Sequence, residues 1–275
     1  MTIDPAIVGR EFPAFDIEYA TDDVILYALG IGAGRAEAEA KYVRGDGLEV
    51  FPLYPVVTAS KVFTSMTDVL EVDGTKRLHG EQRLKLHAPL PTAGRMHVTA
   101  RAESVWDKGA GAVIDTVAEF RVGSELVASA TFSSFIRDGG GFGGERGDGL
   151  ERCAYDRAPD VVADDVMSWN QALLYSLTGD DNPLHLDPEF ARRSGFDRPI
   201  AHGLCTLGFG ARMGIVAADL EDRVAEINCR FISPVYPGEK LRLEAWRDGG
   251  ALRGILYAGD RIAIDPLEIV TRNTD

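Results

Sequence analysis

The sequence predicts an α+β protein in which antiparallel sheets curl around buried helices. Strand patterns follow helical segments in blocks instead of alternating with them, and this order favours antiparallel sheets over a parallel α/β fold. The helical pattern over 203–220 contains Gly208, Gly210 and Gly214. Glycine weakens a helix by about 0.5–1 kcal/mol, but a missing side chain lets another backbone approach closely. We therefore expect this helix to lie inside a sheet that wraps around it.

In the first half, three strand patterns follow helical segments, the first of which contains Val24–Leu29. The turn signal Asp107-Lys-Gly109 lies between the first two strands and predicts a hairpin. The three predicted strands are Arg95–Val105, Ala112–Val122 and Glu125–Arg137.

In the second half, Ser168-Trp-Asn-Gln171 fits a capping box, in which Ser168 and Gln171 satisfy free N–H groups at a helix start. Helical spacing of apolar residues continues to Leu177, and Gly179 is expected to end the helix in the left-handed conformation. A second helix is predicted over Gly203–Leu220. The strands that follow are Lys240–Arg247, Leu252–Ala258 and Arg261–Thr271, with the turn signal Asp248-Gly-Gly250 between the first two.

The two halves look like copies of each other. An offset of 148 residues aligns Val24–Leu29 with Ala172–Leu177, and an offset of 145 aligns Leu86–Pro89 with Phe231–Pro234. Between the halves, the stretch from Asp138 to Gly149 is too rich in glycine for the interior of a helix or strand. We therefore predict an N-terminal repeat at 1–138, a linker at 139–149 and a C-terminal repeat at 150–275.

Composition excludes several classes of protein. The 275 residues are 45% hydrophobic and 26% charged, as in a globular protein, and the net charge of −14 argues against a nucleic-acid partner. Apolar runs are shorter than the roughly 18 residues of a membrane span, and the first twenty residues do not resemble a secretory signal. Cys153, Cys205 and Cys229 show no paired spacing, which fits a reducing compartment.

One loop carries residues suited to acid–base chemistry. Asp180, Asn182 and His185 follow the expected helix end at Gly179, and Pro183 within this segment prevents the helix from resuming. An irregular loop can turn a carboxylate and an imidazole toward one water, and the two groups would then form a general acid/base pair. The alternative is a polar turn with Asx capping, in which His185 is a surface residue.

A second stretch, Pro199–Thr206, is suited to stabilising negative charge. Gly203 lies where the long helix is expected to begin, and unpaired N–H groups at a helix start can stabilise a developing oxyanion. The alternative is that His202 caps the helix or packs locally. A metal is not expected, because His202 and Cys205 lack a second ligand pair at zinc spacing. No Gly-x-Ser-x-Gly nucleophile motif is present.

These two stretches carry a family resemblance. Tyr175–His185, Gly195-Phe196 and Pro199–Thr206 resemble the signature of the MaoC-like (R)-specific 2-enoyl-CoA hydratases, or hydratase 2. In the first half, His79–Gln82, Pro89–Pro91 and Gly139–Gly144 resemble the N-terminal half of the two-domain form found in peroxisomal multifunctional enzyme type 2. The resemblance covers nearly the whole chain and implies a double hot-dog fold, with two antiparallel sheets that each wrap around a long helix.

The resemblance also implies residue roles. Asp180 and His185 match the catalytic pair that activates water, Asn182 its supporting polar residue, and Gly203 the residue whose N–H holds the thioester oxygen. In the first half, Gly32, Gly34 and Glu37 stand at the corresponding positions, so this copy is expected to be non-catalytic and to accommodate the acyl chain. Predicted substrate-binding residues are His79, Gly80, Arg192, Arg193, Arg198, His202 and Arg230.

The expected activity is reversible hydration of trans-2-enoyl-CoA to (3R)-3-hydroxyacyl-CoA in fatty-acid or related metabolism. The alternatives are a dehydratase acting on acyl-carrier protein, a non-catalytic acyl-thioester binding protein, and a thioesterase. Coenzyme A enters as part of the substrate, so no cofactor or metal is expected. A homodimer is expected. The chain ends in Asn-Thr-Asp, which is not a peroxisomal Ser-Lys-Leu signal, so a bacterial cytoplasmic location is the default and a peroxisomal one applies in a eukaryote.

Overall fold

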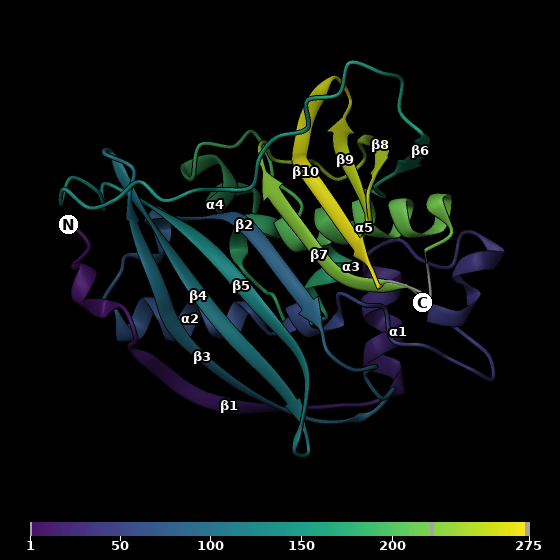
Figure 1. Ribbon diagram of the computed structural model, residues 1–275, viewed down its shortest axis with the longest axis horizontal. Coiled ribbons are helices and arrows are strands. Elements are labelled where there is room, and N and C mark those ends of the chain that lie inside the picture. Colours follow the sequence, from purple (N-terminus) through teal and green to yellow (C-terminus); the bar gives the residue numbers. More distant parts are fainter. Residues whose placement is uncertain (1, 221–222, 273–275) are drawn as a thin grey trace.

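The computed structural model describes residues 2–220 and 223–272, and over these residues the strands form one ten-stranded antiparallel sheet (Figure 1). Every pairing of neighbouring strands is antiparallel, as the sequence predicts. The strands are β1 Glu11–Tyr19, β2 Arg77–Leu86, β3 Gly94–Asp107, β4 Gly111–Val122, β5 Glu125–Arg137, β6 Val161–Val166, β7 Val224–Phe231, β8 Lys240–Asp248, β9 Ala251–Ala258 and β10 Arg261–Thr271.

The order of the strands repeats the same topology twice. The first half runs β1-β3-β4-β5-β2 and the second runs, from the opposite edge, β6-β8-β9-β10-β7. β2 and β7 meet at the centre, where Glu81–Lys85 pair with Glu226–Arg230. This two-fold arrangement agrees with the duplication seen in the sequence.

Helices cover the inner face of the curved sheet. Figure 1 shows α2 running behind the strands of the first half and α5 behind those of the second. The α-helices are α1 Thr21–Gly30, α2 Ala59–Val69, α3 Gln171–Ser176, α4 Pro188–Arg193 and α5 Gly203–Ala218. Short 3-10 helices are η1 Pro5–Ile7, η2 Glu37–Tyr42, η3 Tyr54–Thr58, η4 Gly74–Lys76 and η5 Pro183–His185. This is the double hot-dog arrangement, and no described helix is long and apolar enough to cross a membrane.

The glycines of α5 allow the close packing that the sequence predicts. A Cβ at Gly214 would lie 2.8 Å from the side chain of Ile269, and one at Gly210 would lie 3.2 Å from Leu267, both on β10. A Cβ at Gly208 would collide with Ile31 of the first half. The helix therefore contacts the sheet through Gly210 and Gly214 and the other repeat through Gly208.

The start of α3 differs from the prediction. Ser168 does not cap the helix, because its hydroxyl donates to the side-chain oxygens of Asn170 and Gln171 at 2.8 and 2.9 Å, and Asn170 is the N-cap residue. Gln171 instead donates its amide N–H to the carbonyl oxygen of Gly30 at 2.7 Å. The expected capping box was therefore wrong, since Gln171 satisfies the C-terminal end of α1 in the other repeat. α3 ends at Ser176, before Gly179 adopts a φ of 115°.

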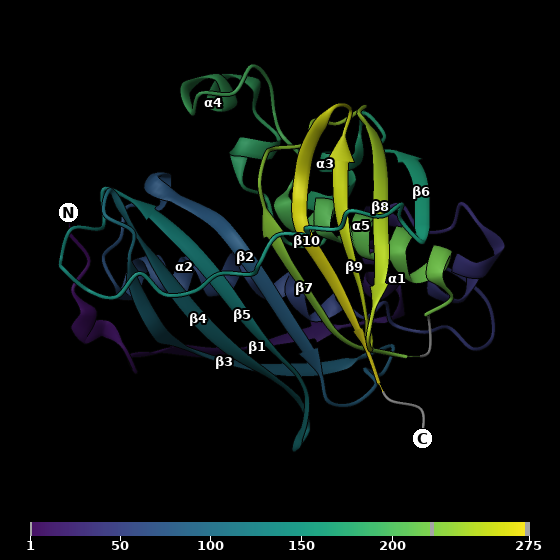
Figure 2. The same cartoon turned by 45° about the horizontal axis from the view of Figure 1, so that its top comes forward.

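The segment 139–149 contains no helix or strand and crosses the outer face of the sheet (Figure 2). Its anchor is Asp107, whose carboxylate accepts backbone N–H bonds from Gly109, Gly141 and Gly143 at 2.7–2.9 Å. These hydrogen bonds lower the pKa of Asp107 to about 2. Close wrapping around one carboxylate explains why this stretch uses glycine, and Gly141, Gly143 and Gly147 have positive φ.

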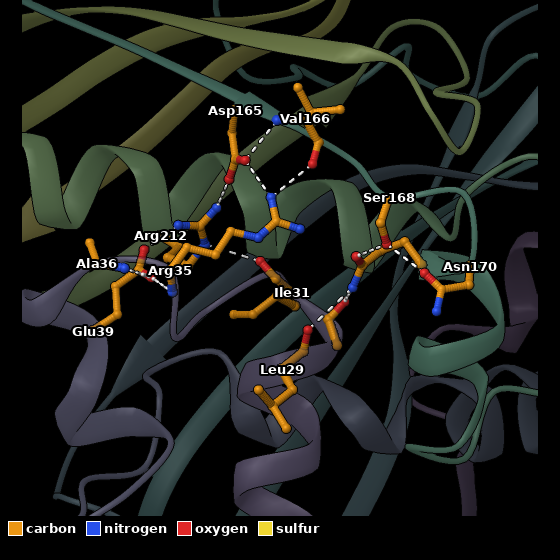
Figure 3. Close-up of polar contacts among 12 residues, drawn as sticks. Leu29, Ile31, Arg35, Ala36, Glu39, Asp165, Val166, Ser168, Asn170 and Arg212 are labelled. Carbon is orange, nitrogen blue, oxygen red and sulfur yellow. Dashed lines mark hydrogen bonds and ion pairs between the residues drawn. The ribbon is translucent and has the colours of Figure 1, made fainter.

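Buried ion pairs join the two repeats on the side of α5 (Figure 3). The guanidinium of Arg212 on α5 contacts the carboxylates of Glu39 on η2 and Asp165 on β6, and its Nε–H donates to the carbonyl oxygen of Ile31 at 3.1 Å. Arg35 also pairs with Asp165. The side chains of Arg212 and Glu39 are 5% and 2% exposed, so these charges compensate one another away from water.

Candidate active site

The loop between α3 and α4 presents the predicted acid–base residues. Asn182 accepts a hydrogen bond from the N–H of Leu184 at 3.0 Å and so caps η5, the single turn that carries His185. The carboxylate of Asp180 accepts from the N–H of Asn182 at 3.3 Å. The polar-turn alternative is therefore correct for Asn182, whose side chain shapes the loop that carries Asp180 and His185.

His185 is held as a neutral imidazole with one free nitrogen. Its Nδ1 lies 2.9 Å from the carbonyl oxygen of Ile200, which can only accept, so Nδ1 carries the proton and Nε2 keeps its lone pair. Burial lowers the pKa of His185, and the nearby charge of Asp180 partly opposes that effect. A neutral imidazole beside a carboxylate is the state required of a general base near pH 7.

His202 is buried against this pair. Its ring centroid lies 3.8 Å from that of His185 and 4.9 Å from that of Tyr175, and the residue is 1% exposed. Nε2–H of His202 donates to the backbone carbonyl of Asp180 at 3.0 Å, while Nδ1 is buried without a protein partner. Burial and the neighbouring His185 lower its pKa to about 3. His202 therefore positions the Asp180 loop, and its side chain makes no cap bond to α5.

The three side chains Asp180, His185 and His202 present oxygen and nitrogen atoms that all lie within 4.8 Å of one another. The two imidazole planes are tilted by 35° with their centroids 3.8 Å apart, and each ring already has one nitrogen hydrogen-bonded to a backbone carbonyl.

Gly203 is the first residue of α5, where backbone N–H groups have no partner within the helix. A Cβ at this position would lie 3.4 Å from the ring of Phe231, at the end of β7. The ring of Phe231 also packs 4.9 Å from that of His79 on β2. The helix start, the acid–base loop and the central strands therefore converge on one region.

The central seam of the sheet opens at this region. β2 pairs with β7 only from Glu81 onward, so Gly80 and Phe231 border the point where the two strands separate. A pocket of about 360 Å³ lies there on the outer face. Its basic and aromatic lining residues are Arg83, Trp106, Lys108, Phe135, Arg146, Arg230 and Phe231.

The predicted substrate-binding residues divide into two groups. His79, Gly80, His202 and Arg230 lie at the acid–base cluster or the pocket, although Arg230 is already paired with Glu81 at 3.0 Å. The other three arginines do not line that pocket. Arg192 and Arg193 are exposed on α4, which projects from the top of Figure 2, and Arg198 stacks 4.9 Å from the rings of Trp169 and Tyr236.

Sequence reasoning missed three basic residues of the pocket, Arg83, Lys108 and Arg146. No local pattern marks them, because β2, the turn between β3 and β4, and the linker bring them together only in the folded chain. It also missed the carbonyl of Ile200, which fixes the tautomer of His185.

Known proteins resemble both halves of the chain. The MaoC like domain matches residues 152–256, and the MFE-2 hydratase 2 N-terminal domain matches residues 17–138. Peroxisomal multifunctional enzyme type 2 of Mus musculus is 40% identical over 258 residues, which are 89% of this chain. The chain spans only 35% of the length of that mouse protein.

Two further proteins match over nearly their whole length. Enoyl-CoA hydratase ChsH3 of Mycobacterium tuberculosis is 37% identical over 278 residues, covering 96% of each chain. A crystal structure of a MaoC-like dehydratase from Phytophthora capsici superposes with a TM-score of 0.86 at 29% identity and covers 98% of each chain. Since both repeats match their own domain family and a 37% identical relative is covered almost end to end, the chain belongs to the MaoC-like hydratase 2 family.

Proposed function

We propose that this protein catalyses the reversible hydration of trans-2-enoyl-CoA to (3R)-3-hydroxyacyl-CoA. The observation that carries the proposal is the neutral His185, which keeps Nε2 free and has a ring nitrogen within 4.8 Å of a carboxylate oxygen of Asp180, next to the start of α5. Relatives named as enoyl-CoA hydratases support the same reaction.

The side chains supply both proton transfers of the addition. Asp180 and His185 hold one water and take a proton from it as its oxygen bonds to C3 of the enoyl group. The thioester oxygen gains negative charge, which the N–H of Gly203 stabilises. The pair then delivers a proton to C2, so water is added across the double bond and the site returns to its starting state.

We assign the pocket at the open seam to the phosphates of coenzyme A. It holds Arg83, Lys108, Arg146 and Arg230 together with the carboxylates of Glu81, Asp115 and Asp148, and Phe231 lies between it and Gly203. The coenzyme A part of a thioester bound at Gly203 would extend past Phe231 into this pocket. We place the phosphates here instead of at Arg192, Arg193 and Arg198, because the pocket adjoins the site of reaction.

The first repeat is assigned a non-catalytic role. Gly32, Gly34 and Glu37 hold the positions that correspond to the acid–base set, and a Cβ at Gly32 would lie 2.7 Å from the ring of Phe209. Accommodation of the acyl chain by this repeat is part of the proposal.

A homodimer is also proposed. Trp169, Leu173 and Leu177 lie four residues apart on and beside α3 and are 75%, 58% and 68% exposed. Three large apolar side chains at helical spacing are typical of a surface that another protein covers. Sedimentation of the wild-type chain and of Leu173→Ser should give a dimer and a monomer, respectively.

The function is tested with crotonyl-CoA and purified protein. We expect loss of the enoyl absorbance and formation of the (3R) product, at a rate unchanged by a metal chelator. The second candidate is a dehydratase of carrier-protein substrates; a 36% identical relative named 3-hydroxyacyl-thioester dehydratase Y supports dehydration of a thioester, and its name does not specify the carrier. Matched C4–C16 thioesters of coenzyme A and of acyl-carrier protein, with one steroid thioester, separate the two. Product of (3S) configuration, or no turnover of any thioester, would refute the hydratase.

A further inference from the structure

The linker supplies part of the wall of the pocket at the open seam. Arg146, Asp148 and Gly149 line that pocket together with residues of the sheet. The Arg146 side chain is exposed and makes no hydrogen bond or ion pair with any residue that the structure describes. The other cationic side chains of the pocket each contact a protein oxygen atom; they are Arg83, Lys108 and Arg230. Within the described part of the chain, Arg146 is thus the cation of this pocket that is left for a ligand.

Lys108 and Trp106 hold the linker at Arg146 and Gly147. Nζ of Lys108, in the turn after β3, donates to the carbonyl oxygen of Arg146 and to that of Gly147, the latter at 3.1 Å. Gly147 has a φ of 62° and lies on the Trp106 indole, since a Cβ there would be 2.2 Å from the ring. The indole is itself fixed, because its Nε1–H donates to the carboxylate of Asp115 at 2.7 Å. A side chain at position 147 would therefore displace the linker.

A second anchor holds the chain at Leu150, directly after the linker. The Glu81 carboxylate accepts from the N–H of Leu150 at 3.0 Å, and Nη1 of Arg230 donates to the carbonyl oxygen of Leu150 at 3.1 Å. Glu81 on β2 and Arg230 on β7 are also paired with each other at 3.0 Å, across the junction of the two repeats. Gly149 packs against this pair, because a Cβ there would lie 2.4 Å from Arg230. Residues 146–149 are therefore fixed at both ends.

We propose that residues 146–149 are a phosphate-binding arm, in which Arg146 contacts the phosphates of coenzyme A and Lys108 is a positioning residue. Lys108 acts through the backbone of Arg146, and the two anchors keep the guanidinium at the pocket. Four cationic and three carboxylate side chains line the pocket, so its net charge favours an anion. This inference rests on the proposed function, since it assigns residues to the carrier part of the same substrate.

The first test moves the linker without changing any charge. Gly147→Ala forces the backbone off the indole, and the KM for crotonyl-CoA should rise about two- to fivefold, the scale of an exposed ionic contact. Crotonyl-pantetheine lacks the nucleotide phosphates, so its KM should be nearly unchanged. Gly143→Ala is the matched control, because Gly143 is a linker glycine with a φ of 78° whose added Cβ would meet no described residue beyond its chain neighbours within 4 Å. It should leave the ratio of the two KM values as in wild type.

A double-variant cycle separates positioning from direct contact. Lys108→Met and Arg146→Met should each raise the KM for crotonyl-CoA about two- to fivefold. If Lys108 acts through Arg146, the double variant should have the same KM as Arg146→Met. Lys85→Met is the charge control, since Lys85 pairs with Glu226 at 3.0 Å and does not line the pocket; its KM should equal that of wild type.

Folded Gly147→Ala and Lys108→Met proteins with the wild-type ratio of KM values would overturn the proposal. Losses from Lys108→Met and Arg146→Met that multiply in the double variant would also overturn it, because Lys108 would then contact the phosphates itself.

Calorimetry with free coenzyme A tests the arm without the reaction. Arg146→Met should bind coenzyme A about two- to fivefold more weakly than wild type, and equal binding would count against the arm. A wild-type protein that shows this difference in binding but does not hydrate crotonyl-CoA would refute the proposed function and support the arm.

Discussion

Removal of Arg212 should show how strongly the buried ion pairs join the two repeats. Arg212→Met leaves Glu39 buried without its cation and leaves Asp165 with only Arg35. Breaking a buried pair by removing one partner costs about 3–5 kcal/mol, because an uncompensated charge stays buried. For a chain of this size that loss corresponds to a drop of about 6–20 °C in melting temperature.

The assay is urea unfolding of Arg212→Met, Glu39→Gln and the double variant. The double variant should be more stable than Arg212→Met, because removing Glu39 as well relieves its buried charge. Arg44→Met is the control, since Arg44 pairs with Glu37 on the surface, where such pairs contribute about 0–1 kcal/mol. A loss below about 1 kcal/mol in Arg212→Met would refute the view that these pairs stabilise the contact.

Three further predictions concern packing, protons and substrate binding. Gly208→Ala should cost about 1–3 kcal/mol in urea unfolding, because the added methyl collides with Ile31; an unchanged midpoint would contradict this packing. The pKa values of His79 and His202 are lowered to about 3, so the unfolded chain binds more protons. The free energy of unfolding should be at its full value above about pH 6.5 and fall toward pH 3, and it should fall less steeply in His79→Gln. An equal pH dependence in wild type and His79→Gln would count against the burial of His79. The KM for crotonyl-CoA should rise between 0.1 and 1 M salt, as the Debye length falls from about 10 to 3 Å, and Arg146→Ala should weaken this dependence; a flat KM would exclude phosphate recognition by exposed arginines.

Much of the fold was predictable because its signals are local. Turn residues and alternating apolar positions identified both hairpins, and α5 ends within two residues of the predicted boundary. Neither the edge strands β1 and β6 nor the central strands β2 and β7 were predicted. β1 contains Pro13 and a register shift between Phe12 and Phe15, and β6 has mostly exposed or half-exposed positions. An edge strand has one neighbour and little burial, so its sequence carries a weak signal.

The candidate site was predictable only where its residues are close in sequence. Asp180 and His185 lie on one loop, and the chain itself brings them together. The bond from His202 to the carbonyl of Asp180 joins residues 22 positions apart, and no local pattern encodes it. Gln171 shows the same limit, because its partner is the carbonyl of Gly30 in the other repeat.

The central claim is that Asp180 and His185 act as one unit on a single water. It is tested by kcat/KM for crotonyl-CoA in Asp180→Asn, His185→Gln and the double variant, each first shown to be folded. Each single variant should lose about 10²–10⁴-fold, the usual contribution of acid–base groups. The double variant should be only slightly less active than the less active of the two single variants. The losses caused by removing groups that work together do not multiply. Near-normal hydration by either single variant, or a double loss equal to the product of the two single losses, would contradict the account.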